Sequence, residues 1–400
     1  MIHETPLIDL SLSERLDELD RLRGQLSTKT HASSRWIGNL RRLARAQAVE
    51  SSVSIEGYHV SLEQARAIID KGRGPESDDT AEQAVACYGR AMDHVAVLAS
   101  DPSFQWSERL LLDLHFDACY FQFERKPGQW RTGPVYVKSG QKTVYEGPEP
   151  ARVPTLVKEL VTWLQDGDLA THAVVRAAMA HLHLVSIHPF RDGNGRLSRI
   201  LQSLVLAREG ILDPEFASIE EYLGEHTDEY YSALDEAHGS VFDPSRDART
   251  WIEFCITAHL TQARTRLLTL EEARHRWDIC EQIAQARQWP DRLVIAMEQA
   301  LTGTLTNASY RAEADVTSEA ARLDFKRLLD SGLIVQQGSG RATRYRASTA
   351  LKEHIAPNGS PTRVSVPRRS PTVKITASPS AGAARDVAVR STYANDTFRK

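Results

Sequence analysis

The run His-Pro-Phe-Arg-Asp-Gly-Asn-Gly-Arg-Leu-Ser-Arg at residues 188–199 constrains the fold more than any other stretch of this chain. Gly193, Asn194 and Gly195 let the backbone approach a ligand closely, because glycine lacks a Cβ and tolerates unusual dihedral angles. The apolar stretch at residues 197–206 predicts a buried helix directly afterwards. The glycine loop is therefore expected at a helix N-terminus, where free N–H groups and the helix dipole attract anions.

Four side chains of this run are candidates for catalysis or for binding an anion or a metal. His188 is the residue whose ordinary pKa suits proton abstraction near neutral pH. Asp192 precedes the glycines, where a carboxylate can hold Mg²⁺ against phosphate oxygens or can simply cap the helix. Arg196 and Arg199 are three positions apart, share a helix face and can both reach one polyphosphate. The run is not a Walker A loop, because the Gly-Lys-Ser/Thr ending is missing.

The run resembles the Fic motif, His-Pro-Phe-x-Asp/Glu-Gly-Asn-Gly-Arg-x-x-Arg, at every defined position. The resemblance implies a mainly helical Fic core that uses ATP and Mg²⁺ and transfers AMP to a hydroxyl side chain of a target protein. It also implies that His188 is the base that deprotonates this hydroxyl and that Asp192 binds the Mg²⁺. The implied phosphate contacts are Gly193, Asn194 and Gly195 with the α-phosphate, and Arg196 and Arg199 with the outer phosphates.

A second segment, Ser52-Val-Ser-Ile-Glu56-Gly57, ends a predicted helix at residues 40–55. Taken alone, Glu56 would be a solvated residue of the last helical turn, and Gly57 a C-terminal cap. The segment also resembles the Fic inhibitory motif Ser/Thr-x-x-x-Glu-Gly/Asn. That resemblance implies that Glu56 pairs with Arg199 and blocks productive binding of the γ-phosphate. The helix dipole disfavours a glutamate at this end, so a role other than helix stability is expected. The chain thus resembles the subclass with an N-terminal inhibitory helix.

Two β-rich triplets at residues 135–137 and 143–145 flank a glycine-containing turn and predict a hairpin. The resemblance implies that this hairpin is a flap whose edge pairs with an extended target segment by β-augmentation. A hairpin without function is the alternative. The flap residues implied to lie over the nucleotide are Val137, Lys138, Ser139 and Gly140.

A tyrosine pair, Tyr230 and Tyr231, belongs to a Tyr-Tyr-x-x-Leu pattern that lies near the adenine in Fic proteins. Aromatic residues of helices more often pack in a core, so both interpretations stay open. His238 stands where many Fic proteins have asparagine, which puts adenine recognition at that position in doubt.

The C-terminal part predicts three helices, at residues 292–301, 307–313 and 317–330, followed by two strand-like segments, which is the plan of a winged helix. Basic residues gather in its last helix and wing, and such clusters contact DNA phosphates in other proteins. Acidic residues interleave with them, so dimerisation or target docking is favoured over DNA binding. The basic residues are Arg322, Lys326, Arg327, Arg341, Arg344 and Arg346.

The composition bounds the remaining choices. A chain of 400 residues predicts two or three domains, and its net charge of −4 argues against a general nucleic-acid binder. We expect a cytoplasmic protein, because the chain has no run of membrane-spanning length, no secretion signal and four scattered cysteines without a C-x-x-C. The predicted parts are a helical region at 1–105, a Fic core at 106–270, a winged helix at 290–348 and a disordered tail at 353–400.

These patterns together predict an autoinhibited protein adenylyltransferase that modifies Ser, Thr or Tyr hydroxyls of a target protein and of itself, and that can form a homodimer. Two alternatives remain. The chain could remove AMP, with Glu56 orienting a water molecule, or it could be a DNA-binding regulator whose Fic core senses nucleotide. A pure sensor has no need of His188, which disfavours the regulator.

Overall fold

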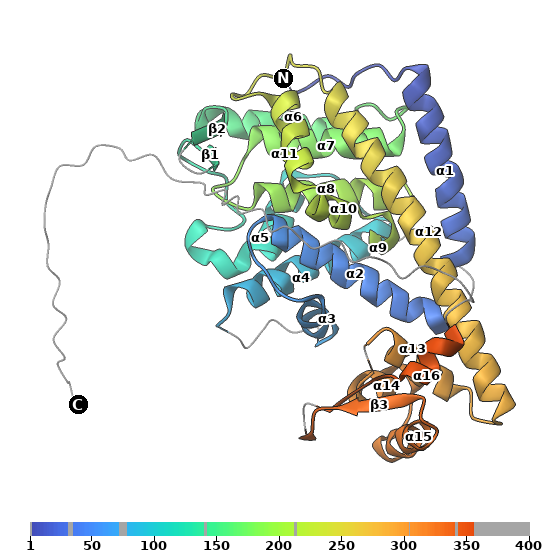
Figure 1. Ribbon diagram of the computed structural model, residues 1–400. Coiled ribbons are helices and arrows are strands. Elements are labelled where there is room, and N and C mark those ends of the chain that lie inside the picture. The colour runs from blue at the N-terminus through green and yellow to red at the C-terminus, as the bar shows by residue number, and fades with distance from the viewer. Residues whose placement is uncertain are drawn as a thin grey trace, which may run out of the picture.

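The computed structural model describes residues 2–30, 35–71, 78–139, 142–211, 214–303, 305–340 and 343–355, and this part of the chain is mainly helical (Figure 1). Its strands form two antiparallel hairpins, β1 with β2 and β3 with β4. The elements are α1 (Leu10–Thr30), α2 (Arg35–Ile55), α3 (Leu62–Lys71), α4 (Thr80–Ser100), α5 (Glu108–Cys119), η1 (Tyr120–Arg125), β1 (Tyr136–Ser139), β2 (Lys142–Glu146), η2 (Pro150–Arg152), α6 (Val153–Asp166), α7 (Ala173–Ile187), α8 (Asn194–Arg208), α9 (Pro214–Ala217), α10 (Glu220–Glu225), α11 (Thr227–His238), α12 (Arg249–Ala286), α13 (Arg292–Leu301), α14 (Asn307–Ala314), α15 (Ser318–Asp330), β3 (Ile334–Gln337), β4 (Arg344–Ala347) and α16 (Thr349–Ile355).

The centre of the molecule is the pair α7 and α8, which pack against each other and are surrounded by α4, α11 and α12. Helix α7 is mainly apolar, and every residue from Val174 to Ile187 is buried. A helix that is buried on all sides belongs to the interior of a protein. The loop between α7 and α8 carries the motif at residues 188–199, so the motif is anchored at both ends in the core.

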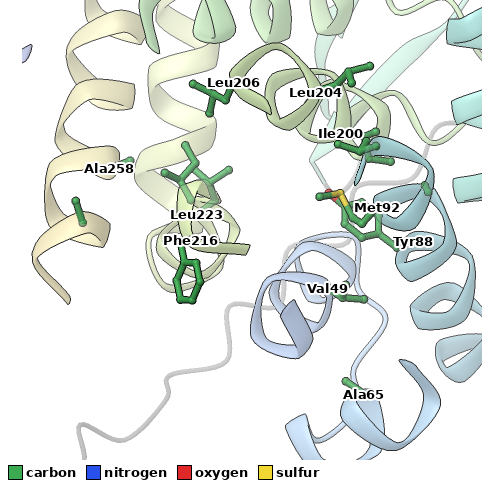
Figure 2. Packing of buried hydrophobic residues seen from close by; sticks show 14 of the residues in the cluster. Val49, Ala65, Tyr88, Met92, Ile200, Leu204, Leu206, Phe216, Leu223 and Ala258 are labelled. Carbon is green, nitrogen blue, oxygen red and sulfur yellow. The ribbon is translucent and has the colours of Figure 1, made fainter. Parts of the chain in front are cut away.

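Helix α2 lies across α4 and α10 (Figure 1). One cluster of buried hydrophobic residues joins α2, α4 and α8 (Figure 2). It includes Val49 of α2, Tyr88 and Met92 of α4, and Ile200 and Leu204 of α8. Each aliphatic side chain of this size contributes about 1.5–3 kcal/mol when fully buried. The packing therefore fixes α2 firmly against the helix that follows the motif.

Local signals end the helices around α2 as expected. The helix stops at Ile55, and Gly57 follows with φ of +87°, a left-handed conformation that costs glycine little. Ser61 and Gln64 then form the predicted capping box of α3, because each side chain bonds the main-chain N–H of the other. The predicted helix end and the predicted helix start are both confirmed.

The long helix α12 runs alongside α1 and continues to the C-terminal part of the chain (Figure 1). It passes without a break through residue 270, so the predicted boundary of the Fic core at 270 falls inside a helix and stays a prediction. The apolar pattern weakens there, but Leu270, Ala273 and Trp277 still pack inward. Continuous packing, rather than the pattern of one turn, decides where this helix ends.

The C-terminal module, residues 292–355, has the predicted order of three helices and a hairpin. It also contains α16, which extends to Ile355, so residues 353–355 of the tail predicted to be disordered are helical. Leu351 is fully buried and holds this helix on the module. The rest of the predicted tail, residues 356–400, lies outside the described residues.

Two further expectations concern the cysteines and the absence of a membrane-spanning run. Cys87, Cys119, Cys255 and Cys280 are all buried free thiols, as predicted. Among the described residues, no helix combines the length and apolarity that crossing a membrane requires.

Candidate active site

The motif loop begins where α7 ends. His188 follows Ile187 with φ of +50° and so turns the chain out of the helix. Phe190 is completely buried and stacks on His115, with ring centroids 3.6 Å apart. Gly193 has φ of +77°, and a Cβ there would overlap the sulfur of Cys119. The loop therefore has one tightly packed course, and only glycine fits at position 193.

Asn194 holds this loop closed. Its Oδ1 accepts a hydrogen bond from the Phe190 main-chain N–H at 2.9 Å, and its Nδ2 donates to the Phe190 carbonyl at 3.0 Å. These two bonds use one of the two N–H donors of Nδ2, so the side chain braces the loop and keeps a donor in reserve. The main-chain N–H of Asn194 lies in the first turn of α8, and the contact of Asn194 with the α-phosphate stays a prediction.

His188 is placed as a proton acceptor. Its Nδ1 lies 3.0 Å from the Val185 carbonyl and donates to it, which leaves the lone pair on Nε2. Burial lowers the pKa of His188 to about 4, although the bond to Val185 opposes this shift. Arg131 fixes the backbone of the same residue, since its Nε donates to the His188 carbonyl at 2.7 Å. His188 is thus neutral at pH 7, with a free basic nitrogen.

The two motif arginines are buried deeply, with 1% of Arg196 and 2% of Arg199 exposed. Nε and Nη1 of Arg196 and Nη1 of Arg199 have no acceptor among the described residues. A buried guanidinium donor without an acceptor is costly, so these atoms favour an anionic ligand. Together with the N-terminus of α8, they fit the phosphates of a nucleotide.

Glu56 occupies the space next to that helix N-terminus. Its Oε1 accepts a charge-assisted hydrogen bond from Arg199 Nη2 at 2.8 Å. The same Oε1 lies 2.7 Å from where a Cβ on Gly195 would be. Ser52 accepts two further hydrogen bonds from Arg199. Nε of Arg199 donates to the Ser52 hydroxyl oxygen at 2.7 Å, and Nη2 donates to the Ser52 carbonyl at 3.1 Å. The pairing of Glu56 with Arg199 predicted from the sequence is present.

One cavity of about 350 Å³ joins these parts, a size suited to a small ligand. Several predicted residues line it, and they come from the motif, the hairpin, α11 and the segment at residues 52–57. Arg196, Ser52 and Gly57 are not part of the lining. The predicted residues in the lining are Glu56, Val137, His188, Asp192, Gly193, Asn194, Gly195, Arg199, Tyr230 and Tyr231.

The predicted flap residues are described only in part, and the two tyrosines of α11 differ in burial. Lys138 and Ser139 lie in β1, but their side chains are outside the described residues, as is Gly140 altogether. Tyr230 is 1% exposed, and its hydroxyl lies 3.1 Å from His181 Nε2, so it is mainly a core residue at the edge of the cavity. Tyr231 is less buried and lines the same cavity.

Asp192 is the carboxylate available for a metal. Its Oδ1 accepts from the Gly193 N–H at 2.6 Å and from Arg196 Nη2 at 3.3 Å, and its Oδ2 accepts from Gln122 Nε2 at 3.2 Å. The described residues hold no group of three or more His, Cys, Asp or Glu side chains arranged for a metal. Mg²⁺ is commonly held by one or two carboxylates plus substrate phosphates, and this donor set fits that mode alone.

Five residues that contact the motif or line the cavity were not singled out from the sequence. Gln122 and Arg131 belong to irregular stretches after α5, and His115 Nε2 donates to the Asp192 carbonyl at 2.8 Å. Asp228 and Asp235 of α11 line the cavity. No local periodicity or motif marks these residues, since only the packing of α5 and α11 beside the loop brings them there.

Known proteins resemble this chain in sequence and in fold. Residues 105–206 match the model of the Fic/DOC family. The protein adenylyltransferase Fic of Drosophila erecta is 31% identical over 209 residues, which are 49% of this chain and 39% of that protein. The chain therefore spans about two fifths of the length of the curated relatives it matches.

Solved structures extend the likeness beyond the motif. A Fic family protein from Desulfovibrio desulfuricans superposes with a TM-score of 0.56, covering 87% of this chain and 98% of that one, at 21% identity. Fic-1 (residues 134–508) of Caenorhabditis elegans gives a TM-score of 0.52 at 26% identity, covering 64% of this chain and 71% of that one. The first likeness shows a shared fold, and the second adds sequence similarity to it.

Proposed function

Since the chain is a Fic-domain protein, we propose that it is an autoinhibited protein adenylyltransferase, which transfers AMP from ATP to a Ser, Thr or Tyr hydroxyl of a target protein and of itself. One observation carries the proposal. The free Nε2 of His188 and the anion site at the α8 N-terminus share one cavity, and Glu56 sits in that anion site bonded to Arg199. A proton acceptor beside a phosphate site is what hydroxyl transfer requires.

The reaction follows from these positions. His188 takes the proton of the target hydroxyl on Nε2 while the hydroxyl oxygen bonds to the α-phosphorus, and the bond to the bridging oxygen of pyrophosphate breaks. The main-chain N–H groups at Gly193 to Gly195 hold the α-phosphate, and Arg196 and Arg199 hold the outer phosphates. Asp192 would hold Mg²⁺, which neutralises charge on the phosphates. The tightly packed motif loop keeps these donors in place, so they need not reorganise during the reaction. Such preorganisation is the main source of electrostatic catalysis.

Inhibition follows from the same contacts. A carboxylate at the α8 N-terminus competes with phosphate for the helix dipole and for the guanidinium of Arg199. While Glu56 stays there, ATP binds with its outer phosphates displaced and the α-phosphorus badly aligned for attack. The same carboxylate lines the cavity that contains His188, so it is also placed to orient a water molecule. Removal of AMP from a modified protein is therefore the second candidate function.

The C-terminal module is proposed to be a winged helix that serves dimerisation or target docking in a cytoplasmic protein. Its order of elements supports the winged helix. Asp324, the acidic residue in the middle of α15, is buried and bonded to Arg292 and Tyr310. The outward face of α15 is thus more basic than its sequence suggests, with Arg322 and Lys326 exposed, so DNA remains a weaker second partner.

The test is transfer of label to protein. Wild type, Glu56→Gly, and the double variant Glu56→Gly with His188→Ala are each incubated with cell lysate and ATP labelled either at the α- or at the γ-phosphate. Lysate without added protein gives the background. Above it, we expect Glu56→Gly to place α-label, and no γ-label, on protein, and the double variant to place none. Transfer of γ-label above this background would indicate a kinase and refute the proposal. Release of AMP from prelabelled target by wild type would support the second candidate.

A further inference from the structure

Gln122 lies outside the motif, but its side chain contacts the motif because the backbone of η1 is irregular at this residue. It lies in η1, between α5 and the hairpin, and has non-helical dihedral angles of φ −110° and ψ 53°. Its neighbour Phe123 is 67% exposed, whereas the Gln122 side chain contacts the motif. The break in η1 thus separates a surface residue from one that reaches the candidate site.

The amide of Gln122 makes three hydrogen bonds there. Its Nε2 donates to Asp192 Oδ2 at 3.2 Å and to the Tyr58 hydroxyl at 2.7 Å. Its Oε1 accepts from Arg196 Nη2 at 2.8 Å. The donor end therefore faces an anion and a hydroxyl, and the acceptor end faces a cation. An amide side chain carries two N–H donors and a separate acceptor oxygen, so these partners fix its orientation.

These bonds keep the two charged groups from neutralising each other fully. Arg196 Nη2 approaches Asp192 Oδ1 only at 3.3 Å, because the same nitrogen also donates to Gln122 at the shorter distance. A bidentate pair would use both oxygens of Asp192 and two nitrogens of Arg196. In the observed arrangement Nε and Nη1 of Arg196 stay free of acceptors among the described residues.

Aromatic rings hold the same guanidinium from the sides. The Arg196 carbon Cζ lies 5.2 Å from the centroid of Phe121 and 5.8 Å from that of Tyr58, and the two rings meet edge to face. Such contacts favour the charged arginine without consuming its N–H donors. Tyr58 directly follows the inhibitory segment, so Gln122 also ties the end of that segment to the motif.

We propose that Gln122 is a positioning residue for nucleotidyl transfer: it limits Asp192 and Arg196 to one shared bond through Nη2, so that the carboxylate can take a divalent cation and the remaining guanidinium donors a phosphate. The inference rests on the proposed function for its meaning in catalysis. Its binding consequence does not depend on transfer, because both groups are expected to meet the metal–nucleotide complex before any chemistry.

The first test therefore measures binding. The parent is the full chain with His188→Ala, which prevents turnover, and the probe is Mn²⁺ with ATP, followed by electron paramagnetic resonance of free Mn²⁺. We expect Gln122→Leu, of similar size and without polar atoms, to weaken Mn²⁺–ATP binding about tenfold or more. The exposed residue Gln285 supplies the matched control, since Gln285→Leu should change nothing.

The second variant guards against misfolding. Gln122→Glu keeps an acceptor for Arg196 but replaces the donor to Asp192 with a repelling carboxylate, so Mn²⁺–ATP binding should also weaken. Unchanged binding in a folded Gln122→Leu protein, or unchanged binding in Gln122→Glu if the leucine variant does not fold, overturns the inference. The same substitutions are also made in the Glu56→Gly chain, and AMP transfer is measured there. If Mn²⁺–ATP binding is weakened but AMP transfer is unchanged, Gln122 acts in binding alone, and its role in the reaction is overturned.

Discussion

Replacing Glu56 tests the proposed inhibition at its single ionic contact. The Glu56 carboxylate is 20% exposed, while the Arg199 side chain that it bonds is 1% exposed. Glu56→Gly removes the carboxylate from the α8 N-terminus and frees one N–H of Arg199 Nη2 and the space over Gly195. Arg199 keeps its two bonds to Ser52, so the substitution does not leave the guanidinium without partners.

The size of the effect follows from the bonds that change. A hydrogen bond to a charged group contributes about 1.5–3 kcal/mol, and each 1.4 kcal/mol corresponds to about a tenfold change in rate. Release of the single Glu56 contact therefore predicts about 10- to 100-fold faster AMP incorporation. Glu56→Gln keeps the shape and one neutral bond to Arg199, so it should fall between wild type and Glu56→Gly.

The assay is the initial rate of α-label incorporation at several ATP concentrations, with thermal unfolding of each variant as a folding control. Ser52→Ala is the matched comparison, since it removes one bond to Arg199 but leaves the Glu56 carboxylate in place. It should activate much less than Glu56→Gly. Arg199→Ala added to Glu56→Gly should not be active, because it removes the phosphate ligand together with the lock. Equal rates for wild type, Glu56→Gln and Glu56→Gly at every ATP concentration would refute the reasoning.

The other predictions concern three residues. His188→Ala should abolish AMP transfer while ATP binding, measured by calorimetry, stays close to wild type, because the base does not hold phosphate. The burial-lowered pKa of about 4 keeps His188 neutral, so the imidazole of the free protein should protonate in a nuclear magnetic resonance titration only as the pH falls through about 4, and protonation near 6.5 would contradict the placement. Asp192→Ala, or excess EDTA, should remove transfer, and full activity in EDTA would exclude a metal held by Asp192. Burial raises the pKa of Glu220 to about 7 against 4.5 in the unfolded chain, so its contribution to stability is present below pH 4.5 and is lost as the pH rises through 7. Glu220→Gln should be more stable than wild type at pH 8 by up to about 3 kcal/mol in denaturant titrations, with no gain at pH 4.

The sequence indicated the motif loop, the buried helix after it, the hairpin and the Glu56 contact with Arg199. Those features are carried by glycines, charges and apolar periodicity that act locally or belong to a known pattern. Asn194 shows the limit of a motif, which cannot tell whether a polar side chain binds the ligand or closes its own loop. Gln122 lies 70 positions from Asp192 along the chain, and its contact depends on how η1 packs beside the loop. A single sequence holds no local signal for such a contact.

Helix α2, which precedes Glu56, is held at both of its ends, and this decides what activation by a Glu56 substitution would mean. Near its start, Asn39 donates to Thr302 of the C-terminal module, and Arg42 forms an ion pair with Glu313 of α14. Near its end, only the Ser52 and Glu56 contacts reach Arg199. Since the apolar face of α2 and its contacts with the module stay intact when Glu56 is replaced, the helix remains docked. Activation by that substitution therefore reports the loss of one carboxylate from the anion site, rather than the loss of the helix.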